Sequence, residues 1–143
     1  ILAILLPYPF HLSGPYSINN FIMFIVALIL GLFLVTALNL LMHILTMFTL
    51  DEKGSMTTYS VIADIFMGGT VPIPFFPTWL KHIAEFLPFR FIGDFPFRIY
   101  SNSIPLEEGY ILIIGSIIWI IITISLGYLI SRVSLRKAVI QGG

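Results

Sequence analysis

Long uninterrupted runs of apolar residues dominate this sequence. Residues 21–50 contain no Asp, Glu, Lys or Arg, and at about 1.5 Å per residue they would form a helix about 45 Å long. A second uncharged run, residues 109–131, also has the length that crosses the roughly 30 Å hydrocarbon core of a bilayer. The pattern predicts an all-α membrane bundle, with spans over residues 21–50 and 106–131.

A third apolar segment, residues 55–76, is interrupted by residues that a membrane helix rarely carries. We expect it to be a broken span, joined to the first span by a tight polar turn at Asp51, Glu52, Lys53 and Gly54. The interruptions are one carboxylate, two glycines and two prolines: Asp64, Gly68, Gly69, Pro72 and Pro74. Irregular backbone inside a membrane is tolerated only against protein or a water-filled cavity. A plain helix end is the alternative interpretation of the same residues.

The remaining segments are predicted to lie at the outer membrane surface or in the tail. Residues 1–20 would be the end of an earlier span and an outer loop with Tyr8, Phe10 and Tyr16 in an interfacial belt. Residues 77–105 would form short surface or re-entrant helices. The first of these has apolar positions at helical spacing, with Lys81, His82 and Glu85 on the other face. Arg90 and Asp94 are four positions apart, which suggests an ion pair.

Basic residues give the orientation. A cytoplasmic tail, residues 132–143, would put four basic residues at the inner end and three at the outer end, a weak positive-inside bias. The inner four are Lys53, Arg132, Arg136 and Lys137, and the outer three are Lys81, Arg90 and Arg98.

Composition excludes several classes of protein. Hydrophobic residues make up 58% of the chain and charged residues only 10%, with no net charge, so a nucleic-acid partner is not expected. The absence of cysteine removes disulfides and thiolate sites. His11, His43 and His82 are too far apart to predict a metal site. With no phosphate-binding loop and no nucleophile elbow, we predict no catalytic residue and no bound cofactor.

Polar residues within the first span form a single stripe, spaced three, four and three positions apart: Thr36, Asn39, His43 and Thr46. Such residues can serve helix packing or line a transport path. Counted from the predicted turn, His43 and Asp64 lie at about 12 Å and about 15 Å depth on antiparallel helices. We therefore consider two arrangements equally: a hydrogen bond between them, or Asp64 facing a wet cavity alone. A row of small residues on the last span, Thr123, Gly127 and Ser131, predicts close helix packing.

Together these features define a candidate transport path or gate. Its members are Asn39, His43, Asp64, Gly68, Gly69, Pro72 and Pro74.

The segment from Gly68 to Arg90 carries a specific motif. It reads Gly-x-x-x-Pro-x-x-x-Phe-Pro-x-Trp-Leu followed by Leu-Pro-Phe, with Pro72, Phe76, Pro77, Trp79, Leu80, Leu87, Pro88 and Phe89 in the motif positions. Pro96 and Tyr100 match a Pro-x-x-x-Tyr element, and the basic, Gln-Gly-Gly ending of residues 135–143 is also similar. Across residues 50–143 the chain resembles the permease subunits of type-2 ATP-binding-cassette exporters.

The resemblance implies a six-span permease, of which this chain would be the C-terminal half with spans four to six. Such permeases sit in the bacterial plasma membrane with both termini cytoplasmic, pair with a second permease protomer, and work with a separate ATPase subunit that binds ATP. The turn at Asp51, Glu52, Lys53 and Gly54 would face that ATPase. The alternative is a scaffold or accessory subunit of a membrane complex. An integral-membrane transferase or protease is a weaker third possibility.

Overall fold

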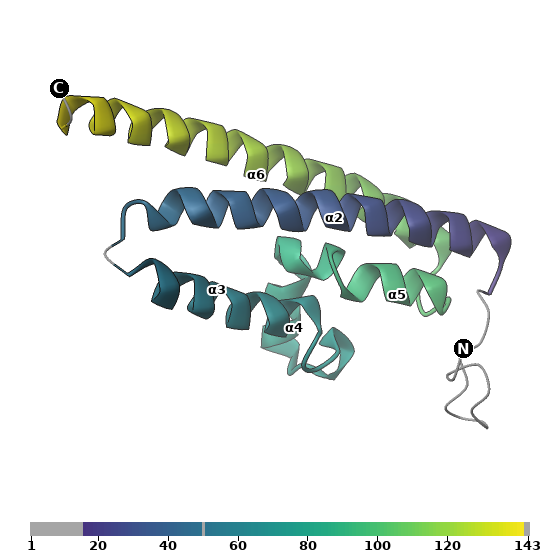
Figure 1. The fold of residues 1–143 in the computed structure, drawn as a ribbon. Helices are drawn as coiled ribbons and strands as arrows, with labels where there is room; N and C mark the ends of the chain where they lie inside the picture. Colours follow the sequence, from purple (N-terminus) through teal and green to yellow (C-terminus); the bar gives the residue numbers. More distant parts are fainter. Residues whose placement is uncertain (1–15, 50, 142–143) are drawn as a thin grey trace, which may run out of the picture.

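The fold is helical throughout the part of the chain that the computed structural model describes, residues 16–49 and 51–141 (Figure 1). The predicted all-α class is confirmed. The expected earlier span and most of the outer loop, residues 1–15, lie outside the described residues. The helices are α2 (Ile18–Thr46), α3 (Glu52–Met67), α4 (Thr78–Phe86), α5 (Asp94–Tyr100) and α6 (Leu106–Gln141), with short 3-10 helices η1 (Ile73–Phe75) and η2 (Pro88–Phe91).

The two longest helices, α2 and α6, lie side by side and run in the same direction (Figure 1). A Cβ placed on Gly109, near the start of α6, would collide with Met23 near the start of α2. Near their other ends, Gly127 faces Ile44. The α2–α3 turn and the C-terminal end of α6 therefore lie at the same end of the bundle, as predicted. By length and composition, Ile18–Thr46 and Leu106–Arg132 can each cross a membrane.

The outer surface of the bundle is apolar. Many large apolar side chains of α2 and α6 point outward, and Leu32, for example, is 65% exposed. The helix contacts combine apolar side chains such as Leu34 and Leu38 with small and polar residues such as Ser116 and Thr123, of which Thr123 is only 2% exposed. Small residues allow membrane helices to approach closely. The predicted packing row on the last span therefore does face α2 at Thr123 and Gly127.

Capping residues move the helix ends away from the predicted bounds. α2 begins at Ile18 because the Ser17 hydroxyl accepts a hydrogen bond from the Asn20 N–H, and it ends at Thr46 rather than at residue 50. Asp51 caps α3 by accepting from the Gly54 N–H at 2.9 Å. Glu52 to Gly54 are thus the first turn of a helix, not a free turn. α6 continues to Gln141, so most of the expected tail is helical.

The predicted broken span over residues 55–76 is not one continuous helix. α3 has 16 residues, about 24 Å at 1.5 Å per residue, which is short of a full hydrocarbon core. It ends at Gly68, whose φ of 81° is a left-handed conformation that favours glycine. A Cβ on Gly93 would lie 2.6 Å from the Met67 carbonyl oxygen, so the start of α5 abuts the end of α3.

α3 and α5 therefore follow one another along α2, and residues 68–93 form a detour between them (Figure 1). The junction lies near the middle of α2: a Cβ on Gly31 would be 3.3 Å from the Phe91 carbonyl oxygen, and Gly31 is about as far from Ile18 as from Thr46. A third membrane crossing, made by α3 and α5 together, stays a prediction.

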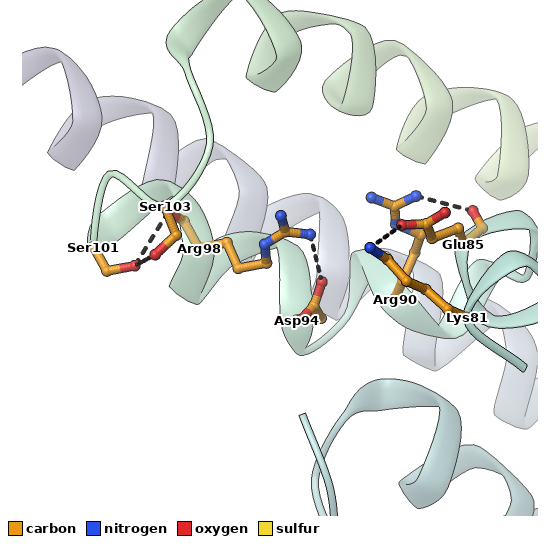
Figure 2. Close-up of polar contacts among 7 residues, drawn as sticks. All are labelled: Lys81, Glu85, Arg90, Asp94, Arg98, Ser101 and Ser103. Carbon is orange, nitrogen blue, oxygen red and sulfur yellow. Dashed lines mark hydrogen bonds and ion pairs between the residues drawn. The ribbon is translucent and has the colours of Figure 1, made fainter. Parts of the chain in front are cut away.

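Within the detour, α4 turns its apolar side outward. Phe86 is 74% exposed and Trp79 is also exposed, whereas Ala84 is buried. Lys81 and Glu85 are half-buried and form an ion pair at 3.9 Å (Figure 2). The predicted amphipathic helix is thus present, and its exposed apolar side is the arrangement expected of a helix in contact with lipid.

Candidate functional site

A pocket of about 670 Å³ opens where α3 ends and α5 begins. Five of the seven candidate path residues line it: Asp64, Gly68, Gly69, Pro72 and Pro74. α5 contributes the other charged groups, Asp94 and Arg98. The structure therefore brings together most of the residues that the sequence singled out, although it does so at the junction of two separate helices rather than within one broken helix.

Asp64 organises the turn at the end of α3. Its side chain is exposed, and Oδ2 accepts a hydrogen bond of 2.6 Å from the Thr70 hydroxyl. Its main-chain carbonyl accepts from the Gly69 N–H at 3.0 Å. A Cβ on Gly69 would collide with Asp64 Oδ1. The two glycines are therefore needed for the turn itself: Gly68 for its left-handed conformation and Gly69 for space.

Asp94 and Arg98 form the second polar pair of the pocket. Arg98 Nη1 lies 3.5 Å from Asp94 Oδ2, and the Asp94 side chain is only 5% exposed (Figure 2). A partner of opposite charge stabilises a carboxylate with so little contact with solvent. The expected pairing of Asp94 with Arg90 is wrong. α5 begins at Asp94, and the residue four positions further along this helix is Arg98, which therefore lies beside the Asp94 carboxylate.

Arg90 instead caps the C-terminal end of α4 with its side chain. Its side chain is buried, and Nη1 donates to the Glu85 main-chain carbonyl at 3.1 Å (Figure 2). That carbonyl belongs to the last turn of α4, where cationic groups are favourable. Among the described residues, Arg90 Nε is the one buried side-chain polar atom without a hydrogen-bond partner.

The structure does not bring His43 and Asp64 together. His43 Nδ1 lies 3.8 Å from Glu52 Oε1, at the start of α3. Asp64 is twelve residues further along the same helix, about 18 Å at 1.5 Å per residue. The hypothesis of a hydrogen bond between them is wrong because α2 ends at Thr46, which places His43 one turn from the helix end instead of deep in the bundle.

Two predicted path residues therefore lie outside the pocket. Asn39 and His43 are exposed on α2, and the pocket does not include them. Thr36, on the same stripe, is also exposed and donates to the Leu32 carbonyl of its own helix at 2.7 Å. A role for Asn39 and His43 in transport stays a prediction.

Sequence reasoning missed a second polar stripe, on α3. Lys53, Thr57, Ser60 and Asp64 are spaced four, three and four positions apart, and all four are exposed. This is the same helical spacing that drew attention to α2. The spacing of polar residues in the sequence is therefore sufficient to identify this stripe. The stripe runs from the α2–α3 turn to the pocket.

Asp94 and Arg98 were also missed as site residues. They stand in the outer segment of the sequence, and nothing in their spacing places them beside Asp64; only the detour of residues 68–93 does so. Within the described residues, no group of three His, Asp or Glu side chains could hold a metal ion.

Two long apolar helices, outward-facing large side chains and a pocket with charged residues at a helix break define this molecule as a helical integral membrane protein. The chain belongs to the family described as ABC-2 family transporter protein, whose family model matches residues 2–142. It is therefore a permease component of an ABC transporter, in agreement with the resemblance seen in the sequence. No curated protein and no solved structure matches this chain.

Proposed function

We propose that this chain is part of the permease of an ATP-driven exporter, and that substrate moves along the exposed face of α3 to the pocket at the α3–α5 junction. The observation that carries the proposal is the position of Asp64. Its carboxylate is exposed on α3 close to the middle of the bundle, at the edge of a pocket. A charged side chain at that depth is costly against lipid, by about 2.5 kcal/mol or more, and is expected to face water or protein.

The polar stripe of α3 supports the same path. Thr57 and Ser60 precede Asp64 on one exposed face, so hydroxyl groups extend from the inner turn to the pocket. The irregular backbone at Gly68 and Gly69 also needs a polar or protein environment, because lipid cannot satisfy free main-chain groups. A path between α3 and a further helix of the assembly would supply that environment.

The energy source in this proposal is another subunit. A separate ATPase subunit would bind ATP and contact the inner end of the bundle, where Asp51 caps α3 and Glu52, Lys53 and Gly54 form its first turn. A second permease protomer, identical or different, would complete the path. The proposed setting is the bacterial plasma membrane, with the C-terminal end of α6 in the cytoplasm.

One observation favours the alternative, a scaffold subunit without transport. The hydroxyls of Thr57 and Ser60 donate to main-chain carbonyls of their own helix, each at 2.9 Å. Hydroxyls that are satisfied in this way do not require a water-filled path. The two functions therefore differ in whether water reaches this face of α3.

Water access can be measured by thiol labelling, since this chain contains no cysteine. The experiment uses the full-length permease assembled with its ATPase, in which any cysteine outside this chain is replaced by serine. In that protein, the thiol of Ser60→Cys should react with a hydrophilic maleimide. Ile118→Cys is the matched control, because Ile118 is also exposed in this chain and its helical neighbours Ile114, Ile121 and Ile122 on α6 are all apolar. Equal, negligible labelling of both variants would favour the scaffold.

Coupling to ATP hydrolysis is the second test. The purified permease should raise the turnover of its partner ATPase in lipid vesicles, and Glu52→Ala with Lys53→Ala should reduce that stimulation because they alter the proposed contact. A permease that binds no ATPase, or leaves its turnover unchanged, would contradict the proposal.

A further inference from the structure

The pocket at the α3–α5 junction has the dimensions of a small-molecule site. Its volume of about 670 Å³ lies within the range of roughly 300 to 1,000 Å³ that is typical of such sites. α3 and the following turn supply one wall, and α5 supplies the other. The pocket is mostly apolar, with Met67, Pro72 and Ile92 among its lining residues. Its few charged groups therefore decide which ligands it can accept.

The charges of the pocket do not balance. Two carboxylates, Asp64 and Asp94, and one guanidinium, Arg98, line it. Arg98 lies 3.5 Å from Asp94, which is nearly fully buried behind it, so these two charges offset each other. Asp64 takes part in none of the ion pairs found among the described residues, and its carboxylate accepts a hydrogen bond from the neutral Thr70. One negative charge is left facing the cavity.

Aromatic rings form the wall that α5 contributes. Phe97 and Tyr100 both line the pocket, and Phe97 is exposed. Phe24 of α2 supports both rings, with ring centroids 6.2 Å from Phe97 and 5.1 Å from Tyr100. The face of an aromatic ring attracts cations, more strongly where water is excluded. A free carboxylate and an aromatic wall in one mostly apolar cavity favour the same kind of ligand.

We propose that this pocket binds amphiphilic organic cations, with the cationic centre beside Asp64 and the apolar groups against Phe97 and the proline-rich turn. The inference rests on the proposed function and names its substrate class. The opposite choice, an anion bound by Arg98, would add a third negative charge to a pocket whose one guanidinium already faces Asp94.

A pair of probes with nearly the same shape and opposite charge separates these choices. Tetraphenylphosphonium is a lipophilic cation, and tetraphenylborate is the corresponding anion. The full-length permease, assembled with its ATPase in detergent, is incubated with each labelled probe, and specific binding is the part that an excess of the same unlabelled probe displaces. We expect displaceable binding of tetraphenylphosphonium and none of tetraphenylborate. If the unmodified protein shows as much displaceable binding of tetraphenylborate as of tetraphenylphosphonium, or more, the proposal is overturned.

Variants locate the bound cation. Asp64→Asn should weaken tetraphenylphosphonium binding at least tenfold, because it removes the charge and keeps the shape, whereas Asp64→Glu should retain most of the affinity. Glu107→Gln is the matched control: it removes a carboxylate from an exposed position at the start of α6, outside this pocket. Unchanged affinity in Asp64→Asn, with a normal gel-filtration profile, would overturn the proposal.

The failure of this inference can be told apart from the failure of the proposed function. If the permease stimulates its ATPase but binds no tetraphenylphosphonium, the substrate class is wrong and the exporter function stands. If it binds the cation but engages no ATPase, the pocket assignment stands and the exporter function is wrong.

Discussion

At the scale of single residues, Asn20 connects more parts of this structure than any residue that the sequence pattern identifies. It is 1% exposed. Its Nδ2 donates to the Ile99 carbonyl at 2.8 Å and to Asn102 Oδ1 at 3.3 Å, and its Oδ1 accepts from the Ser17 hydroxyl at 2.7 Å. One amide thus joins the start of α2 to the end of α5 and to the following turn.

We predict that Asn20→Ala destabilises the permease, because the substitution removes these bonds and leaves the buried Ile99 carbonyl without its side-chain donor. The Ile99 carbonyl keeps its hydrogen bond from the Asn102 N–H at 3.1 Å. The expected loss is therefore mainly that of the two hydrogen bonds that Asn20 Nδ2 donates, about 1 to 3 kcal/mol in total at about 0.5 to 1.5 kcal/mol each. Thermal unfolding of the purified protein in detergent measures it. Asn19→Ala is the control, since Asn19 is the same residue type one position earlier and is exposed. Equal unfolding temperatures for the two variants would show that the Asn20 contacts contribute little.

At the scale of helices, the junction between α3 and α5 depends on close approach of two backbones at Gly93. We predict that Gly93→Ala separates the two helices, because the new Cβ would lie 2.6 Å from the Met67 carbonyl oxygen, a backbone atom that cannot rotate away. Overpacking of this kind usually costs about 1 to 3 kcal/mol. The variant should unfold at a lower temperature and transport more slowly, because the pocket lies at this junction.

Gly127→Ala is the matched control for that experiment. Its Cβ would lie 3.8 Å from Ile44 Cδ1, an ordinary contact distance, and alanine is a better helix former than glycine by about 1 kcal/mol. This variant should be as stable as the unmodified protein or slightly more stable. A larger loss at Gly127 than at Gly93 would contradict the helix arrangement described above.

The sequence could predict the helices but not the contacts that shape the site. The long spans follow from uncharged apolar runs, because length and hydropathy are local properties of the chain. The end of α2 at Thr46 was missed because residues 47–50 are as compatible with helix as the residues before them, and the His43 prediction failed with it. Asp94 and Arg98 reach Asp64 only through the detour of residues 68–93, a tertiary arrangement that no local spacing encodes.

At the scale of the whole molecule, the parallel course of α2 and α6 fixes which segments share a side of the membrane. The α2–α3 turn, with Lys53, lies at the end where α6 finishes, and the turn between α5 and α6, with Ser103, lies at the opposite end (Figure 1). The end with Lys53 carries four of the seven basic residues of the chain, Lys53, Arg132, Arg136 and Lys137. The positive-inside rule therefore predicts a cytoplasmic position for that end.

We predict that Ser103→Cys reacts with a membrane-impermeant thiol reagent in intact cells, whereas Lys53→Cys reacts only after the membrane is permeabilised. Both positions are exposed, and this chain has no cysteine of its own. Opposite labelling behaviour follows from α3 and α5 together carrying the chain from one side of the membrane to the other. Labelling of both residues from the same side would contradict the arrangement in Figure 1, in which the α5–α6 turn and the α2–α3 turn lie at opposite ends of the bundle. In that case α3 and α5 would not form a third crossing, and the pocket between them would open to one side of the membrane only.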